Sequence, residues 1–122
     1  MRIGELARRA GVSVRSLRYY EEQGLLTSER SASGQRHYAE YAVDRVILIQ
    51  RLYAGGLSSR TIAEVIPCVD SPGADTADDA FERMLVERDR LSAHIDDLLA
   101  TRDALDELIA MNRRFRATQA IG

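Results

Sequence analysis

Residues 3–26 read IGELARRAGVSVRSLRYYEEQGLL, and they contain two short apolar patterns on either side of a glycine and a serine. Both patterns have the spacing of an amphipathic helix. Gly11 stands where a first helix would end in a left-handed conformation, and Ser13 is a good N-cap for a second helix from Val14 to about Gln23. The stretch therefore predicts two short helices joined by a tight turn.

The next forty residues predict a small hairpin and two further helices. Residues 25–29 and 36–38 are short extended segments around the polar run 30–35. Apolar helices are expected over 40–54 and over 58–66, the second capped by Ser58, and residues 67–73 break the pattern. The expected core residues of these two helices are Val43, Val46, Ile47, Ile49, Leu52, Tyr53, Ile62, Val65 and Ile66.

A long helix is predicted from Asp75 or Thr76 to about Arg114. At ~1.5 Å per residue it would span about 55 Å, which a domain of four short helices cannot cover. Its inner positions recur with heptad spacing. They are Met84, Leu91, Leu98, Leu105 and Asn112 as d-type residues, and Arg88, Ile95, Arg102 and Ile109 as a-type residues. The alternative to self-association is a helix that folds back on its own domain through Leu85, Leu99 and Leu108.

The orientation of a paired helix follows from Arg88 and Arg102. In a parallel, in-register pair these arginines would meet their own copies, whereas an antiparallel pair can place them elsewhere. The sequence therefore predicts an antiparallel homodimer. Its contact residues are Met84, Arg88, Leu91, Ile95, Leu98, Arg102, Leu105 and Ile109.

Charge is distributed unevenly along the 122 residues, although the net charge is only −2. Residues 1–60 carry ten arginines against six acidic residues, and residues 61–122 carry seven against thirteen. Phosphate binding is therefore expected in the N-terminal half. No apolar stretch reaches the roughly 18 residues that span a bilayer, and Arg2 and Glu5 leave no apolar core for a signal peptide. We expect a cytoplasmic protein with no membrane partner.

Catalytic and metal-binding patterns are missing from the sequence. No Gly-rich phosphate loop, Ser/His/Asp constellation or metal quartet is present, so an enzyme is not expected. With Cys68, His37 and His94 as its Cys and His residues, one subunit offers no metal site and no cofactor is expected, while a site shared by two subunits stays open. Cys68 is a candidate thiol sensor, and its alternative role is that of a small buried apolar residue.

Residues 3–26 closely resemble the winged helix-turn-helix opening of the MerR family of transcriptional regulators. The likeness continues through Arg36-His37-Tyr38, Asp44-Arg45 and Gly55-Gly56-Leu57-Ser58, and covers about residues 1–66. It implies a mainly α fold with four short helices and a β-hairpin wing over 1–69, a linker over 70–75, an antiparallel coiled-coil helix over 76–114 and a tail over 115–122. One departure is Ala39, where the family usually has a Ser or Thr helix cap, and this should cost stability rather than function.

The resemblance also implies the function. Many family members bind promoter DNA as homodimers and bend or untwist it so that RNA polymerase can engage, while some relatives repress. The second helix enters the major groove, with Arg15 as the candidate for base readout. The candidate DNA-contacting residues are Ser13, Arg15, Ser16, Arg18, Tyr19, Tyr20, Gln35, Arg36, Tyr38 and Arg60. Core packing is the alternative role for Tyr19 and Tyr20, whereas Tyr38 is expected to pack under the wing with its hydroxyl free to contact DNA.

Two further expectations concern partners. Drug-sensing relatives carry a ligand domain after the long helix, and the residues that follow Arg114 are too few for one. The rival to a DNA-binding regulator is a protein-interaction or architectural module, similar to a small phage excision factor or to an antiactivator that acts through its acidic coiled coil. The dependence of DNA affinity on salt separates the two, because phosphate contacts release counterions.

Overall fold

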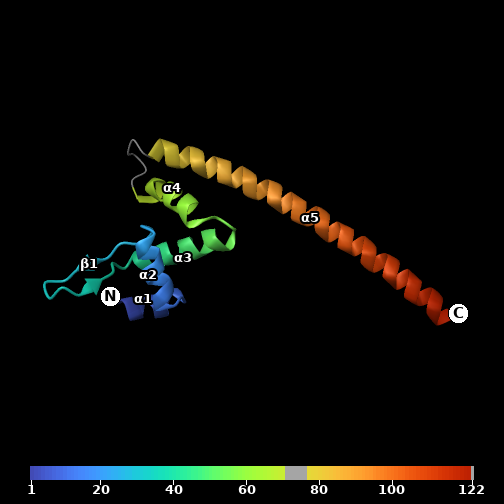
Figure 1. Ribbon diagram of the computed structural model, residues 1–122, viewed down its shortest axis with the longest axis horizontal. Helices are drawn as coiled ribbons and strands as arrows, with labels where there is room; N and C mark the ends of the chain where they lie inside the picture. Colours follow the sequence, from blue (N-terminus) through green and yellow to red (C-terminus); the bar gives the residue numbers. More distant parts are fainter. Residues whose placement is uncertain (71–76, 122) are drawn as a thin grey trace. The chain divides into compact units, whose positions relative to one another are not determined.

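The computed structural model describes residues 1–70 and 77–121, except for the side chains of residues 68, 77 and 121 (Figure 1). The elements in chain order are α1 (Ile3–Ala10), α2 (Val14–Glu22), β1 (Glu29–Arg30), β2 (Arg36–His37), α3 (Ala42–Ala54), α4 (Ser59–Asp70) and α5 (Ala77–Ile121). They form two compact units, residues 1–84 and residues 85–122. The predicted mainly α fold with a small hairpin and a long C-terminal helix is confirmed.

The turn between α1 and α2 forms as its glycine and serine predict. Gly11 ends α1 with φ 73° and donates its backbone N–H to the carbonyl of Ala7. Ser13 caps α2, because its Oγ accepts a hydrogen bond of 3.0 Å from the backbone N–H of Ser16. Both ends of the turn are thus satisfied by local groups, which fixes the direction in which α2 leaves α1.

The core of the first unit is made mainly by aliphatic residues from four helices and from the segment after α2. The largest fully buried side chains are Leu6, Leu17, Leu25, Val46, Ile49 and Ile62. Burying an aliphatic side chain of this size contributes roughly 1.5–3 kcal/mol. Together these residues hold α1, α2, α3 and α4 in one domain. The faces of the helices that point away from this core are left for solvent or a ligand.

The hairpin is shorter than predicted. Its strands pair antiparallel with Glu29 opposite His37 and Arg30 opposite Arg36, and all four residues are exposed. Leu25 and Leu26, expected within the first strand, are buried core residues instead. Because two buried neighbours cannot both lie on one face of a strand, this segment packs as irregular chain.

Helix α3 begins later than predicted, at Ala42 instead of residue 40. A turn precedes it, and the N-cap is Tyr41 rather than Ala39, with no hydrogen bond from the side chain of Tyr41. Ile47, predicted to be in the core, is 46% exposed. Successive helical residues are turned by about 100°, so with Val46 and Ile49 facing inward Ile47 faces outward.

Helix α4 continues past Pro67, which was predicted to end it, and reaches Asp70. Pro67 lies in the last turn, where its missing N–H deprives the carbonyl of Ala63 of a donor. Ala63 is exposed, so water can bond to that carbonyl. The predicted linker over 70–75 and the first residues of the predicted long helix lie largely outside the described residues.

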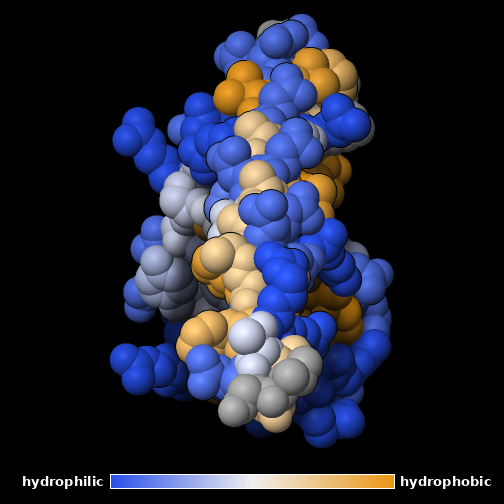
Figure 2. All heavy atoms as spheres, turned by 90° about the vertical axis from the view of Figure 1, so that its right-hand side faces the viewer, coloured by the Kyte–Doolittle hydropathy of each residue, from blue (hydrophilic) through white to orange (hydrophobic). Residues whose placement is uncertain are grey.

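Helix α5 is longer than predicted, with 45 residues and a length of about 68 Å. Residues 115–121, predicted to form a tail, continue the helix because none of them is glycine or proline. Along α5 apolar surface alternates with hydrophilic surface (Figure 2). Within residues 1–70 and 77–121, no helix is long and apolar enough to cross a membrane.

Candidate nucleic-acid interface

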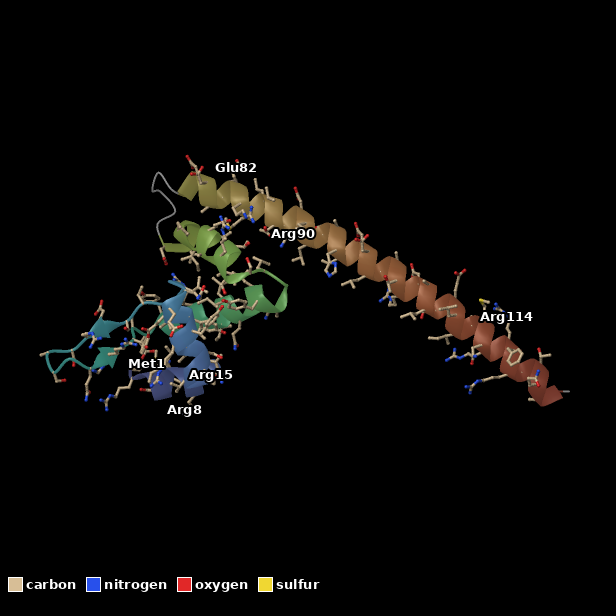
Figure 3. All side chains as sticks on the ribbon, in the orientation of Figure 1. Met1, Arg8, Arg15, Glu82, Arg90 and Arg114 are labelled. Atoms are coloured by element: carbon tan, nitrogen blue, oxygen red, sulfur yellow. The ribbon has the colours of Figure 1, made fainter. Side chains whose placement is uncertain are left out.

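The outer face of α2 carries Arg15, Arg18 and Tyr19, which are all exposed. Their spacing of three and four residues places them side by side on a helix. Leu17 and Tyr20 face the opposite way, into the core. Figure 3 labels Arg15 on α2 and Arg8 on the neighbouring helix α1. The helix therefore presents two guanidinium groups and a phenol from a rigid support.

The start of α2 is favourable for an anion. Ser13 is exposed and its hydroxyl is used locally, since it also donates to Oγ of Ser16 at 3.0 Å. Ser16 is half-buried. The positive end of the helix dipole lies at this turn, next to the exposed Arg15, and both favour phosphate. Ser13 and Ser16 thus shape the helix terminus more than they reach outward from it.

A chain of hydroxyl groups ties the outer face of α2 to α4. The Tyr19 hydroxyl lies 3.1 Å from Oγ of Ser59, and this oxygen is also hydrogen-bonded to the hydroxyl of Tyr53. Tyr19 is thereby held in place while remaining 45% exposed. Sequence reasoning missed Ser59, because no local pattern joins two residues forty positions apart.

Arg60 follows Ser59 in the first turn of α4 and is almost fully exposed. Its Nε lies 3.6 Å from Oε1 of Glu64, one turn further along the helix. An exposed pair at this distance restrains the arginine weakly. Arg60 can therefore turn toward a phosphate group beside α4.

Tyr20 belongs to the core and not to the DNA-contacting set in which the sequence placed it. It is 7% exposed, and its ring stacks on Tyr53 with centroids 5.7 Å apart and planes inclined by 20°. Burial raises the pKa of the Tyr20 hydroxyl. The stacked pair joins α2 to α3 and supports the exposed face from behind.

The wing, which is the hairpin of β1, β2 and the loop between them, presents Gln35 and Arg36. Its tip is closed by hydrogen bonds of 2.7 Å from the N–H of Ser31 to the carbonyl of Gln35, and of 3.1 Å from Nη1 of Arg30 to the carbonyl of Gly34. Gly34 has φ 82°, which few residues other than glycine adopt. Gln35 is exposed, whereas the half-exposed Arg36 forms a 3.2 Å ion pair with Glu21 of α2.

Tyr38 packs under the wing as expected, with 2% exposure, but its hydroxyl is not free for DNA. Its hydroxyl donates a hydrogen bond to Oε1 of Glu21. Burial, followed by the neighbouring Glu21 carboxylate, raises the pKa of Tyr38 to about 12. Sequence reasoning missed Glu21, because Glu21 and Glu22 are adjacent acids and only the fold decides which of them reaches the wing.

The predicted dimer contacts lie along α5. Leu91, Ile95, Leu98, Leu105 and Ile109 are between 37% and 54% exposed, which is high for large apolar side chains. Arg88 and Arg102 are exposed, and Met84 is half-buried. Near the C-terminal end, a shallow hollow of about 350 Å³ is lined by Leu105, Leu108, Ile109, Asn112, Arg113 and Arg116.

The remaining candidates concern metals and thiols. Among the described side chains, no three of the types His, Cys, Asp and Glu come together as a metal site would require. The side chain of Cys68, the candidate sensor, lies outside the described residues.

Comparisons with known proteins agree with this geometry. The family model for MerR HTH family regulatory proteins matches residues 1–67. An HTH-type transcriptional activator SoxR homolog from Chromobacterium violaceum is 36% identical over 107 residues, covering 88% of this chain and 72% of the relative. A mercuric resistance operon regulatory protein from Bacillus cereus is 34% identical over 98 residues, covering 80% of this chain and 74% of the relative.

Two solved structures share the fold. A MerR family transcriptional regulator from Listeria monocytogenes superimposes with a TM-score of 0.79 at 26% identity, over 89% of this chain and 83% of that one. HiNmlR, a MerR family regulator solved bound to promoter DNA, gives a TM-score of 0.77 at 24% identity, over 95% and 92% of the two chains. The family model alone covers more than half of the sequence. This chain therefore belongs to the MerR family of helix-turn-helix transcriptional regulators.

Proposed function

We propose that this regulator binds promoter DNA as a homodimer, with α2 in the major groove and the wing beside it. The observation that carries the proposal is the exposed set Arg15, Arg18 and Tyr19 on a capped helix whose other face is core. HiNmlR, which has the same fold, was solved on promoter DNA. We expect the protein to act in the cytoplasm and to have no catalytic activity, as a transcription regulator.

The exposed residues divide into two roles. Arg15 stands in the first turn of α2, the part of a recognition helix that reaches base edges, and its guanidinium can bond both acceptors of a guanine. Arg18 and Tyr19 lie further along the helix and suit phosphate oxygens, as do Arg36 in the wing and Arg60 on α4. These contacts set register and orientation and do not read sequence. Gln35 at the wing tip contacts the backbone nearby.

The homodimer is proposed to form by antiparallel pairing of α5. The five exposed apolar residues from Leu91 to Ile109 supply the seam, and the a-type arginines avoid their own copies in this orientation. The two ends of α5 are also complementary in charge. Asp78, Asp79 and Glu82 lie near the first end, and Arg113, Arg114 and Arg116 near the last, where Figure 3 labels Glu82 and Arg114. Antiparallel pairing brings these opposite charges together.

A rigid pair of DNA-binding units can deform the duplex between them. Smooth bending of a site of 20–30 base pairs costs on the order of 1–6 kcal/mol, which several phosphate contacts from each subunit can offset. Bending or untwisting would then bring promoter elements into the spacing that RNA polymerase engages.

The test begins with affinity for the DNA upstream of the protein's own gene, measured against salt concentration. Strong salt dependence with preference over a scrambled fragment supports the proposal, and no binding at low salt supports a protein-interaction module instead. Transcription from promoters of varied spacer length then tests the deformation. Activation that is indifferent to spacer length would exclude untwisting.

A further inference from the structure

The carboxylate of Glu21 joins α2 to the wing, and the DNA contacts proposed above do not use it. Its side chain is 15% exposed. The two carboxylate oxygens have different partners. Oε1 accepts the hydrogen bond from the hydroxyl of Tyr38, and Oε2 lies 3.2 Å from Nη1 of Arg36. Arg36 is the first residue of β2, and Tyr38 directly follows this strand.

Besides Glu21, the buried Tyr38 is the main residue that fixes the wing. Each strand has two residues, all of them exposed, and a two-stranded ladder of this length is not stable alone. The base of the hairpin is held by Tyr38, whose backbone N–H bonds to the carbonyl of Met1 at 2.7 Å and whose ring is buried. Among the side-chain hydrogen bonds and ion pairs found in the described residues, those of Glu21 are the ones that link α2 to the wing.

We propose that Glu21 is a positioning residue for DNA binding. It fixes the wing relative to the helix that carries Arg15, and it holds the Arg36 guanidinium until a phosphate group takes it over. The inference rests on the function proposed above. A carboxylate close to the DNA backbone repels phosphate, so on electrostatic grounds alone its removal should strengthen binding. The positioning role agrees for loss of the charge alone, but it predicts that loss of both contacts of Glu21 lowers the preference for the promoter.

The two oxygens make the roles separable. In Glu21→Gln the amide oxygen can still accept from Tyr38, while the charge that restrains Arg36 is gone. In Glu21→Ala both partners are lost, and the buried hydroxyl of Tyr38 loses its carboxylate acceptor. Glu22→Gln and Glu22→Ala are matched controls, because Glu22 is the exposed neighbour on the same helix and carries the same charge.

The experiment measures the dissociation constants of the full-length dimer for its own promoter fragment and for a scrambled fragment, each across a range of salt concentrations. We expect Glu21→Gln to bind both fragments more tightly by a similar factor and to keep the preference for the promoter. Glu21→Ala should lose the preference roughly tenfold, because the wing sets the register in which Arg15 meets its base pair, and a misplaced wing costs the promoter complex about the free energy of one hydrogen bond to a charged group. Its salt slope should fall by about one phosphate contact, that of Arg36. Both Glu22 variants should keep the wild-type preference.

Tyr38→Phe supplies an independent arm, since it removes the hydroxyl and leaves Glu21 and Arg36 in place. It should reproduce part of the loss of promoter preference seen in Glu21→Ala. The double variant Glu21→Ala with Tyr38→Phe should lose little more preference than Glu21→Ala alone. Thermal unfolding establishes which variants are folded, and if Glu21→Ala is not, Tyr38→Phe carries the test.

An unchanged preference in folded Glu21→Ala, or an equal loss in Glu22→Ala, would overturn the positioning role while the wild type still prefers its promoter. A wild type without any preference would instead overturn the proposed function itself.

Discussion

At the scale of single residues, Arg15 and Arg18 lie one turn apart on the same exposed face of α2, yet they are proposed to do different work. Arg15→Ala should weaken binding to the cognate operator by about 1–3 kcal/mol and relax the preference at one base pair. Arg18→Ala should weaken binding to all sequences about equally and lower the salt slope by about one. Competition with base-substituted operators measures both, and equal loss of preference in the two variants would contradict these roles.

Tyr38 makes stability depend on pH in the alkaline range. Its pKa is raised from 10.0 to about 12 in the folded protein, so the folded state favours the neutral phenol. This contribution is fully present below pH 10 and is lost as pH rises from 10 to about 12, at up to about 1.4 kcal/mol per pH unit. The free energy of unfolding of wild type and Tyr38→Phe, measured from pH 8 to pH 12, should converge over that window. Parallel curves would show that Tyr38 does not titrate with unfolding.

Which residues of the proposed DNA-contacting set are exposed was predictable from sequence only where helical spacing decides it. Arg15, Arg18 and Tyr19 lie opposite Leu17 on α2, and the structure exposes them as expected. Tyr20 lies at the edge of the apolar face, where the identity of a tyrosine does not tell packing from contact. Its burial follows from the ring of Tyr53 on another helix, which no local pattern reveals.

At the scale of elements, α1 offers a matched pair of glycines. Gly11 has φ 73° at the end of the helix, and Gly4 lies within it, with no atom near enough to obstruct a Cβ at either position. Gly11→Ala should therefore destabilise the protein by about 1–2 kcal/mol through backbone strain alone. Gly4→Ala should stabilise it by about 0.5–1 kcal/mol, because alanine loses less conformational freedom in a helix. Chemical denaturation measures both, and the same sign for both substitutions would contradict this account.

The element boundaries that were predicted well are those marked by residues typical of helix ends. Gly11 and Ser13 placed the turn between α1 and α2, and both act there as expected. The start of α3 was missed because Tyr41 caps it without a side-chain bond, and the end of α4 was missed because Pro67 is tolerated in a last turn. The end of α5 was missed because heptad spacing stops before the helix does.

At the scale of the whole molecule, the charges at the two ends of α5 test its proposed antiparallel pairing. Arg113→Glu with Arg116→Glu should weaken an antiparallel homodimer roughly tenfold, because acids at both ends then face each other. Asp79→Arg with Glu82→Arg should do the same with bases. A chain that carries all four substitutions should recover the wild-type dissociation constant. Sedimentation at several concentrations measures each one.

The same four substitutions distinguish orientation. In a parallel pair each end meets its own copy, so reversing one end would replace one repulsion with another and leave the dimer unchanged. A dimer that is indifferent to these reversals would therefore be parallel, or would pair without using the ends of α5.

Residues 31–35 at the tip of the wing contribute little to folding, because the hairpin is held at its base by the buried Tyr38 and not by its two-residue strands. A stretch of that kind can be rewritten without unfolding the domain. The tip can be exchanged, lengthened or labelled with a fluorophore. Such a change would alter the contacts made by the wing while α2 keeps its position in the domain.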